Sequence, residues 1–421
     1  MKRLLAVALV AATTAWAAGE ASFLLRGATV HTVSGADIAG GAVLVEDGKI
    51  VEVGAHVAAP KGVRVIDARG LHVYPGMIDS ATEMGLTEIG AVQETNDVSE
   101  IGDYHPQVRA IVAVNPASEH IAVTRANGIT SVVTMPQGGI VCGQAALIHL
   151  DGWTWEEMQI RGSVGMQMSL PAMEAGERRG TRGAGPAPYA ELKRNREKKL
   201  RELHEFFEAA RRYRQAKAAG DGEMKRDLAL EAMAPVLEGK MPVVISAASE
   251  KSIKEALQFA EKEKVRMILA GGQEAYKVAG ELKAKGVAVI LMPTLSLPRD
   301  EDDPYDKAYT QPGELWKAGV KFAFGSFTTS AARNLPYQAA MAVAFGLPYA
   351  EGLRAVTLGA AEIWGVEGEL GSIEKGKWAD LMVTDGDPLE TRTAVKQLYI
   401  KGRAVDLGNK HRRLYERYLG R

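Results

Sequence analysis

The chain has 421 residues, of which 46% are hydrophobic and 24% are charged. Both fractions are ordinary for a globular protein, and this length allows one large domain with a smaller one beside it. The 51 Lys and Arg against 52 Asp and Glu leave a formal net charge of −1, so we expect no nucleic acid as a partner. The single cysteine, Cys142, excludes an intrachain disulfide.

The first residues follow the pattern of a secretory signal peptide, which we predict over residues 1–17. Lys2 and Arg3 precede an apolar run that ends at Ala17 in a small-X-small pattern. The run is short for a membrane span, and a retained N-terminal anchor is the alternative. We therefore expect the mature protein to be periplasmic or secreted.

Apolar segments separated by glycine-rich turns predict short strands near both ends of the chain. The clearest are Phe23–Val30, Gly41–Val45, Ile50–Val53, Ala379–Val383 and Gln397–Arg403. On pattern alone they are either two unrelated β modules or parts of one unit that flanks the middle of the chain.

Between residues 72 and 369, strand-like segments alternate with helical patterns, which is typical of βα units around a parallel sheet. Each strand is almost entirely apolar, as expected where both faces of a sheet are buried. The predicted strands are Ile129–Met135, Pro242–Ser246, Val265–Ala270, Val287–Leu291 and Val320–Phe324. The predicted helices are Ser252–Lys262, Glu274–Lys285, Tyr337–Phe345 and Ala350–Leu358. A barrel and a doubly wound open sheet both fit this alternation.

A segment at about residues 176–238 does not fit a bare barrel. Gly176–Pro188 is rich in Gly, Pro and Arg and predicts a loop, whereas Tyr189–Ala218 predicts a long charged helix. From Tyr189 to Lys217 the helix carries ten Lys or Arg and five Glu. Its Leu and Phe stripe predicts a solvated helix laid over the barrel, and the alternative is a lid or a partner-binding arm.

Two separated motifs resemble those of the amidohydrolase superfamily. Val73–Glu83 is an apolar run interrupted by Pro75-Gly76, and it resembles the family's first barrel strand, Pro-Gly-hydrophobic-hydrophobic-Asp-X-His-X-His. Gly371–Leu381 resembles the family's closing phrase, Gly-Ser-hydrophobic-X-X-Gly-Lys-X-Ala-Asp-Leu. The resemblance implies an α/β fold: a (β/α)8 TIM-type barrel over residues 72–369, with a small β-sandwich built from residues 22–71 and 370–405.

Two further stretches resemble exported members near the imidazolonepropionase and peptidase-like branch of the family. One is Gly143–Thr154, and the other is Ser330–Tyr337, which resembles the eighth barrel loop and brings Asn334 toward the site. The resemblance implies ligands of the amide, cyclic amide or dipeptide kind.

The resemblance also indicates where a metal would be held. The family places two histidines after the first strand, a lysine or glutamate in mid-barrel, a histidine after each of the fifth and sixth strands, and an aspartate after the eighth. Zinc or a similar divalent ion there acidifies the water that attacks the amide. This chain has other residues in those positions: Ser80, Thr82, Gln167, Ser246, Gly272 (with Gly271 as the alternative) and Phe327. We therefore expect no metal and no other cofactor at this site.

Two residues are weak candidates for metal-independent catalysis. Glu83 follows the first strand, and Cys142 lies among glycines. Either would need to lie at the centre of the pocket with a shifted pKa. Acidic loop residues are common, and a lone cysteine is more often a small core residue than a nucleophile.

The sequence therefore favours an exported member of this fold that binds a ligand, or serves as a partner subunit, without metal catalysis. The alternatives are a C–N hydrolase with a metal-independent or unusual-metal mechanism, and a structural envelope protein that uses the charged helix as its contact surface. Expected partners are a small amide-like or peptide-like ligand and, in a homo-oligomer or hetero-oligomer, another copy or a catalytically intact family member.

Overall fold

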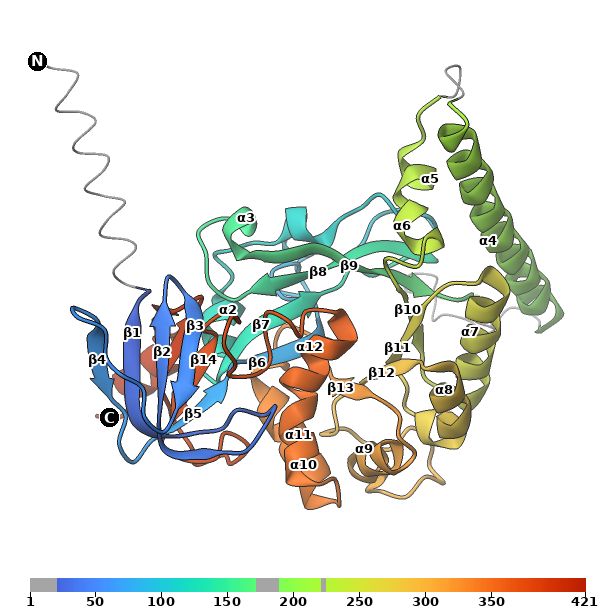
Figure 1. Ribbon diagram of the computed structural model, residues 1–421. Coiled ribbons are helices and arrows are strands. Elements are labelled where there is room, and N and C mark those ends of the chain that lie inside the picture. Colours follow the sequence, from blue (N-terminus) through green and yellow to red (C-terminus); the bar gives the residue numbers. More distant parts are fainter. Residues whose placement is uncertain (1–20, 172–188, 221–224) are drawn as a thin grey trace, which may run out of the picture.

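The computed structural model describes residues 21–171, 189–220 and 225–421, and the predicted signal peptide lies outside these ranges. Within them the chain forms two eight-stranded sheets, one at the chain ends and one in the middle (Figure 1). Helices lie around the second sheet, and the long helix α4 (Tyr189–Ala218) stands at the far side of the molecule from the first.

Strands from both chain ends share the first sheet. Strand β5 pairs in parallel with β1 and antiparallel with β14, so it joins the N-terminal strands to the C-terminal ones. The sheet order is β16-β15-β14-β5-β1-β2-β3, and β4 also pairs with β1. The strands are β1 (Phe23–Val30), β2 (Ile38–Glu46), β3 (Lys49–Gly54), β4 (Arg64–Asp67), β5 (His72–Pro75), β14 (Leu381–Thr384), β15 (Val395–Ile400) and β16 (Arg403–Ala404). Its core includes the stacked rings of Phe23 and Tyr399, whose centroids are 4.5 Å apart.

The second sheet is a nearly closed barrel in the order β13-β12-β11-β10-β9-β8-β7-β6. Its two edges meet where the chain leaves β13, because the Phe327 N–H donates to the Ala81 carbonyl at 2.7 Å. The strands are β6 (Met77–Thr82), β7 (Ile129–Thr134), β8 (Val141–His149), β9 (Gln159–Ser169), β10 (Val243–Ala247), β11 (Met267–Gly271), β12 (Ala288–Leu291) and β13 (Phe322–Phe324). An eight-stranded barrel of this kind fits the predicted TIM-type fold.

One strand departs from the expected all-parallel pattern. Strand β8 pairs antiparallel with both β7 and β9. Only residues 135–140 separate β7 from β8, and only residues 150–158 separate β8 from β9. A parallel crossover needs about a dozen residues or more, so these short connections require antiparallel neighbours.

The barrel helices lie close to the predicted ranges, with two differences. The helix expected over Glu274–Lys285 is divided into a 3-10 turn, η3 (Ala275–Val278), and α8 (Ala279–Lys285). The helix expected over Ala350–Leu358 ends early, and another begins at Leu358. The helices here are α2 (Glu119–Arg125), α3 (Trp155–Met158), α7 (Glu250–Glu263), α9 (Lys307–Lys317), α10 (Leu335–Ala344), α11 (Tyr349–Ala355) and α12 (Leu358–Trp364).

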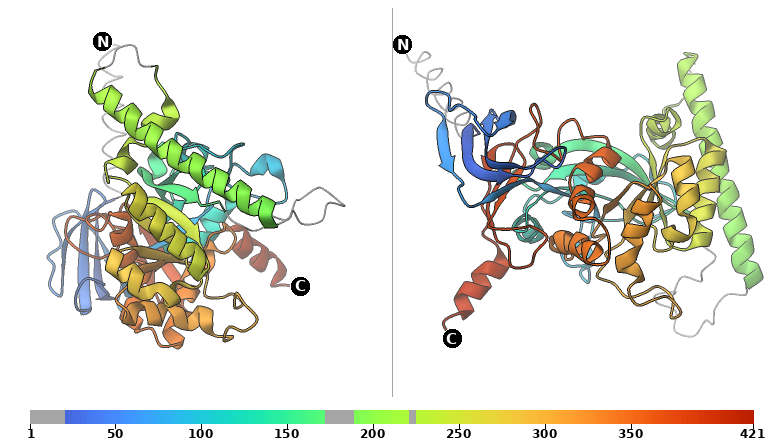
Figure 2. Two further views of the ribbon diagram at one scale, coloured as in Figure 1. Left: turned by 90° about the vertical axis from the view of Figure 1, so that its right-hand side faces the viewer. Right: turned by 60° about the horizontal axis from the view of Figure 1, so that its bottom comes forward.

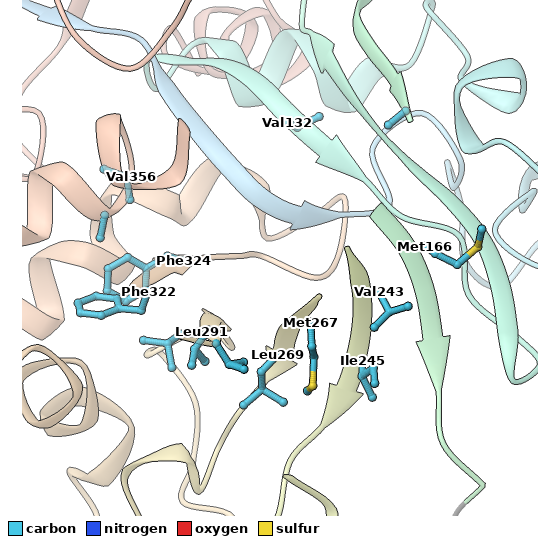
Figure 3. Close-up of a cluster of buried hydrophobic side chains, with 14 of the residues drawn as sticks. Val132, Met166, Val243, Ile245, Met267, Leu269, Leu291, Phe322, Phe324 and Val356 are labelled. Carbon is cyan, nitrogen blue, oxygen red and sulfur yellow. The ribbon is translucent and has the colours of Figure 1, made fainter. Parts of the chain in front are cut away.

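Alternating side chains divide the barrel core into two layers. Val243 and Ile245 belong to the cluster between the strands and the surrounding helices (Figure 3). Val244, between them in sequence, belongs to a second cluster with Ile78 and Ile290, inside the barrel. Successive residues of a strand point to opposite faces, so strands buried on both faces must be apolar throughout.

The insertion is predicted to begin with the loop Gly176–Pro188, which lies outside the described residues, and α4 then spans the range that the sequence predicts for the long helix. Its buried residues are Leu203, Phe207, Ala210 and Tyr213. The rings of Phe207 and Phe259 meet edge to face, with centroids 5.4 Å apart, so the apolar stripe holds α4 against α7. The helix is seen beside α7 in Figures 1 and 2. Two short helices follow, α5 (Leu228–Ala232) and α6 (Ala234–Leu237), and α13 (Lys410–Tyr418) ends the chain. In the described part of the chain, every helix is too short or too polar to span a membrane.

Candidate functional site

The candidate site is the end of the barrel at which the parallel strands terminate. In barrels of this type, residues at the C-terminal strand ends and the loops that follow form the binding site. We use "barrel mouth" for the residues placed there by their strands: Thr82 on β6, Gln167 and Ser169 on β9, Ser246 on β10, Gly272 after β11 and Phe327 after β13.

Gln167 and Ser246 are brought together on neighbouring strands. The register pairs Val244 with Gln167 and Ser246 with Ser169. Gln167 Nε2 donates to Ser246 Oγ at 2.8 Å. Gln167 is buried, and its Oε1 has no hydrogen-bond partner among the described residues, whereas Ser246 is exposed to solvent. This part of the mouth therefore has a buried amide oxygen without a partner beside an exposed hydroxyl.

The end of β6 is used to close the barrel. The Thr82 hydroxyl donates to the Thr328 carbonyl at 3.2 Å, so it is already engaged. Ser80 is fully buried, and no described residue bonds its hydroxyl. The two residues predicted in the positions of the family's histidine pair therefore differ: one is a structural hydrogen-bond donor, and the other is an unpaired buried hydroxyl.

Phe327, which the sequence motifs predict in the family's aspartate position, contributes apolar surface. Its ring packs against the cluster inside the barrel. Its backbone has a φ of +57°, in the left-handed region that non-glycine residues rarely adopt. The chain passes closely here, because a Cβ on Gly325 would lie 2.7 Å from the Ala81 Cβ and 3.0 Å from the Phe327 ring.

Gly272 is also placed where a side chain is difficult to accommodate. Its φ is +57°, and an added Cβ would lie 2.9 Å from Val289 Cγ1. The alternative position, Gly271, has a φ of +101°, and its Cβ would lie 3.1 Å from the Ala247 carbonyl oxygen. A histidine at either glycine would therefore need a change in the backbone.

Asp79, which our sequence reasoning did not single out, is the most perturbed carboxyl near the mouth. Its Oδ1 accepts the Ser326 N–H at 3.0 Å and the Ala81 N–H at 3.2 Å. Its Oδ2 has no partner among the described residues. Complete burial raises the pKa of Asp79 from 3.8 to about 7, against the smaller opposing effect of its hydrogen bonds with Ser326 and Ala81. The only signal in the sequence was a carboxylate in a strand that has no other charged residue.

The two weak catalytic candidates, Glu83 and Cys142, both lie near the mouth but differ in their burial and hydrogen bonding. Burial raises the pKa of Glu83, and its Oε1 accepts a hydrogen bond from Gln137 Nε2 at 2.5 Å. Cys142 is 2% exposed, and burial raises the pKa of its thiol to about 11. The thiolate is the nucleophilic form, so this cysteine is inert near neutral pH.

Asn334 lies apart from the other predicted pocket residues. It ends a 3-10 turn, η4 (Ala332–Asn334), at which the Arg333 carbonyl accepts a hydrogen bond from Asn127 Nδ2 at 2.8 Å. Asn127 stands just before β7 begins. Asn334 is therefore near the N-terminal end of that strand, and the mouth lies at the other end.

These side chains do not fit a zinc site. Zinc takes thiolate, imidazole or carboxylate ligands, and the mouth presents hydroxyl, amide and aromatic groups together with a glycine. Throughout residues 21–171, 189–220 and 225–421, no group of three or more His, Cys, Asp or Glu is arranged to hold a metal ion.

Comparison with known proteins identifies the family. The model of the amidohydrolase family matches residues 121–405. The chain therefore belongs to the amidohydrolase family, as its motifs indicated.

The similar proteins carry related descriptions. The structure of an amidohydrolase from Thermotoga maritima MSB8 superposes with a TM-score of 0.79 at 27% identity, over 91% of this chain and 99% of that one. The amidohydrolase TasK of Hapsidospora irregularis is 26% identical over 400 residues, which are 86% of this chain and 40% of TasK. An N-acyl-D-aspartate deacylase of Alcaligenes xylosoxydans xylosoxydans is 46% identical over 66 residues, 16% of this chain and 13% of the deacylase. This chain thus spans less than half the length of these two relatives.

Proposed function

We propose that this chain is an exported amidohydrolase-family protein that binds a small amide-like or peptide-like ligand at the barrel mouth and does not carry out metal-dependent hydrolysis. The observation that carries the proposal is the set of side chains at the mouth, which includes Gln167, Ser246 and Phe327, the residues that we assign from the sequence motifs to the family's metal-ligand positions. A buried amide oxygen, an accessible hydroxyl and an aromatic ring suit recognition of a neutral amide. Export is supported by the N-terminal pattern of residues 1–17.

Gln167 is the residue from which we expect the largest contribution to recognition. Its Nε2 is held by Ser246, so the orientation of the amide group is fixed and Oε1 is left to accept a hydrogen bond from a ligand N–H. A buried acceptor without a partner costs free energy, and a ligand donor removes that cost.

The experiment combines metal analysis, turnover and ligand binding on the full chain. Zinc content would be measured after incubation with zinc and dialysis, and hydrolysis and calorimetric binding would be tested with dipeptides and cyclic amides. We expect no stoichiometric zinc, no turnover and saturable binding of at least one of these ligands. Stoichiometric zinc with turnover that a chelator abolishes would contradict the proposal.

A matched pair of variants would locate the binding site. Gln167→Met removes the amide at similar side-chain size and is expected to weaken binding by about tenfold, the usual effect of losing a hydrogen bond to a buried group. Gln397→Met makes the same substitution at an exposed position of β15 in the other sheet and should leave binding unchanged. Equal affinity of the two variants would place the ligand elsewhere.

One observation favours a second candidate function, metal-independent hydrolysis. Glu83 has a pKa raised by burial and lies directly after β6, as a general base at the mouth would. Turnover that persists with a chelator and is lost in Glu83→Gln would establish this alternative in place of the binding function.

A further inference from the structure

The last helix, α13, extends from the body of the molecule (Figure 2). None of its residues is buried, and every residue from 410 to 421 is exposed. The helix is attached through its first turn. There the Asn409 side chain accepts the Arg412 N–H at 3.0 Å, and His411 Nδ1 lies 3.0 Å from the guanidinium of Arg333. The remaining turns are therefore open to solvent.

Four large side chains form one apolar side of this segment. They are Leu414, Tyr415, Tyr418 and Leu419, and they are between 39% and 67% exposed. Spacings of three and four residues place them next to one another on the helix surface. A surface helix normally turns such a side toward the core, so its exposure here requires an explanation.

The side of α13 that faces the body is polar. A groove lies between the helix and strand β15, and the α13 residues that line it are Arg412, Arg413 and Glu416. Arg412 pairs with Glu416 at 3.3 Å, and Arg413 pairs with Glu119 of α2 at 3.6 Å. These positions lie opposite the apolar side, because each residue turns the helix by about 100°. The apolar side therefore points away from the body.

Three exposed cations lie along the edge of the apolar side. They are Lys410, Arg417 and Arg421, and none of them forms an ion pair with a described residue. Successive offsets of four, three and four residues connect Lys410, Leu414, Arg417 and Arg421 in one stripe of the helix surface. The guanidinium of Arg421 lies 4.6 Å from the centre of the Tyr418 ring, which keeps that charge beside the apolar side.

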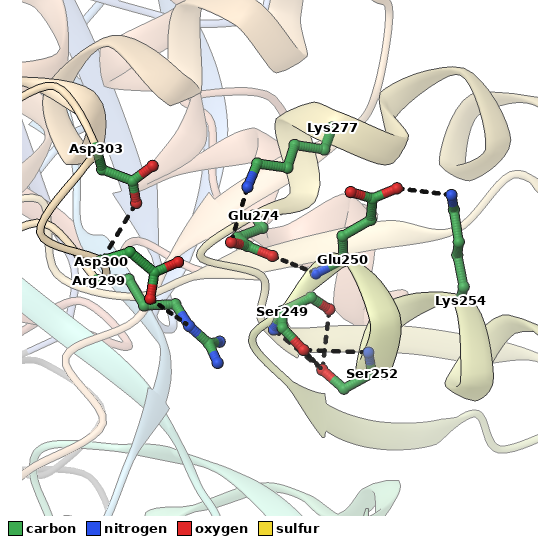
Figure 4. A network of polar contacts seen from close by, with 9 residues as sticks. All are labelled: Ser249, Glu250, Ser252, Lys254, Glu274, Lys277, Arg299, Asp300 and Asp303. Atoms are coloured by element: carbon green, nitrogen blue, oxygen red, sulfur yellow. Dashed lines mark hydrogen bonds and ion pairs between the residues drawn. The ribbon is translucent and has the colours of Figure 1, made fainter.

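The charge around α13 is positive, although the whole chain has a net charge of −1. Residues 410–421 carry five Lys or Arg and one Glu, a side-chain charge of +4. Including Glu119, Asp406 and Arg333 of the neighbouring segments leaves +3. On the barrel, by contrast, a cation such as Lys254 is matched by an acid, Glu250, at 2.7 Å (Figure 4). The positive charge of α13 therefore remains available to an anionic partner.

We propose that α13 and the three residues after it form a docking surface for an anionic lipid bilayer. The helix lies in the plane of the headgroups, with its apolar side among the upper acyl chains and its unpaired cations on lipid phosphates. Leucine and tyrosine suit this boundary, since tyrosine has an apolar ring and a polar hydroxyl. Basic amphipathic helices bind bilayers through apolar burial together with attraction to anionic lipid. The inference is independent of amide binding at the barrel mouth.

The charges favour a bilayer over other partners of this surface. In a symmetric pair of α13 helices from two copies of the chain, the unpaired cations of both would come close together and repel. A nucleic acid would neutralise the cations and leave the apolar side in water. An anionic bilayer satisfies both groups at once.

The test measures co-sedimentation of the full chain with lipid vesicles. One set is phosphatidylcholine alone, and the other is phosphatidylglycerol and phosphatidylcholine in equal parts. We expect the wild-type protein to bind the anionic vesicles about tenfold more tightly or better, and added salt should weaken that binding. Any contribution of the apolar run within residues 1–17 is the same in every variant.

A charge variant tests the cations. Arg417→Gln combined with Arg421→Gln should weaken binding to anionic vesicles by about thirtyfold, about fivefold for each cation, and leave binding to neutral vesicles unchanged. Glutamine is a good helix former, so α13 is retained. The matched control is Lys251→Gln with Lys262→Gln, at two exposed positions of α7, and it should bind as the wild type does.

An apolar variant tests the other half of the surface. Leu414→Gln combined with Leu419→Gln should weaken binding to anionic vesicles by about tenfold or more. Its control is Leu228→Gln with Leu297→Gln, at leucines that are at least as exposed elsewhere on the molecule. Unchanged binding in both α13 variants would overturn the inference, as would a wild-type protein that does not bind anionic vesicles. A dimer that the apolar variant dissociates in sedimentation velocity would also overturn it, because the apolar side would then cover a second copy.

Discussion

Replacing Asp79 with asparagine should remove a large part of the pH dependence of stability. The asparagine Oδ1 can accept the same two hydrogen bonds from Ser326 and Ala81, while the charge is eliminated. The pKa of Asp79 is raised from 3.8 to about 7 by burial, so the folded state retains a proton that the unfolded chain releases between about pH 4 and 7. The stabilisation is fully present below about pH 4 and is lost as the pH rises to about 7.

The size of the effect follows from the shift. One pKa unit corresponds to about 1.4 kcal/mol, so the shift of Asp79 amounts to about 4 kcal/mol. Asp79→Asn should therefore gain stability relative to the wild type by up to that amount between pH 4 and pH 8. Urea unfolding of both proteins across this range measures the difference, with Asp302→Asn, at an exposed position, as the control. An unchanged difference between wild type and Asp79→Asn at all pH values would refute the assignment.

Three further outcomes follow from the packing. Phe207→Ala should lower the free energy of unfolding by about 3–5 kcal/mol in urea titrations, because it empties a buried site between α4 and α7, and Phe206→Ala, at a half-buried position, should cost less. Arg211→Met should cost about 1–3 kcal/mol in the same assay, because it removes the 2.6 Å bond to the buried carboxylate Glu263, which keeps His204 as its other side-chain partner. Cys142 should resist a thiol reagent at pH 8 until the protein is unfolded, because burial raises its pKa to about 11, and rapid labelling of the native protein would contradict this.

The local sequence pattern was sufficient to predict those elements whose ends are determined by one short stretch of sequence. Phe23–Val30 and Tyr189–Ala218 have the predicted ends, because apolar periodicity and turn residues mark them directly. The direction of β8 is not marked in this way. A strand buried on both faces is apolar whether it runs parallel or antiparallel, so only the short connections at residues 135–140 and 150–158 carry that information.

The candidate site was predicted in part, for a similar reason. Family position indicated Gln167 and Ser246 individually, but their hydrogen bond depends on the register of β9 against β10. The raised pKa of Asp79 depends on how deeply it is buried beside Ser326, which is 247 positions away in sequence. Burial and pairing between distant residues arise only when the chain folds, so a short sequence motif does not predict them.

The closure of the barrel explains how this fold is maintained with these side chains at the mouth. The seam between β6 and the segment after β13 is held by hydrogen bonds to Asp79 Oδ1, to the Ala81 carbonyl and from the Thr82 hydroxyl. None of them requires a metal ligand, because the donors and acceptors are backbone groups, one hydroxyl and one carboxyl. Asp79 is the carboxyl among these groups, and the other bonds of the seam do not involve it. A change of the Phe327 side chain can alter what the mouth binds while the barrel stays closed, because Phe327 joins the seam through its backbone N–H.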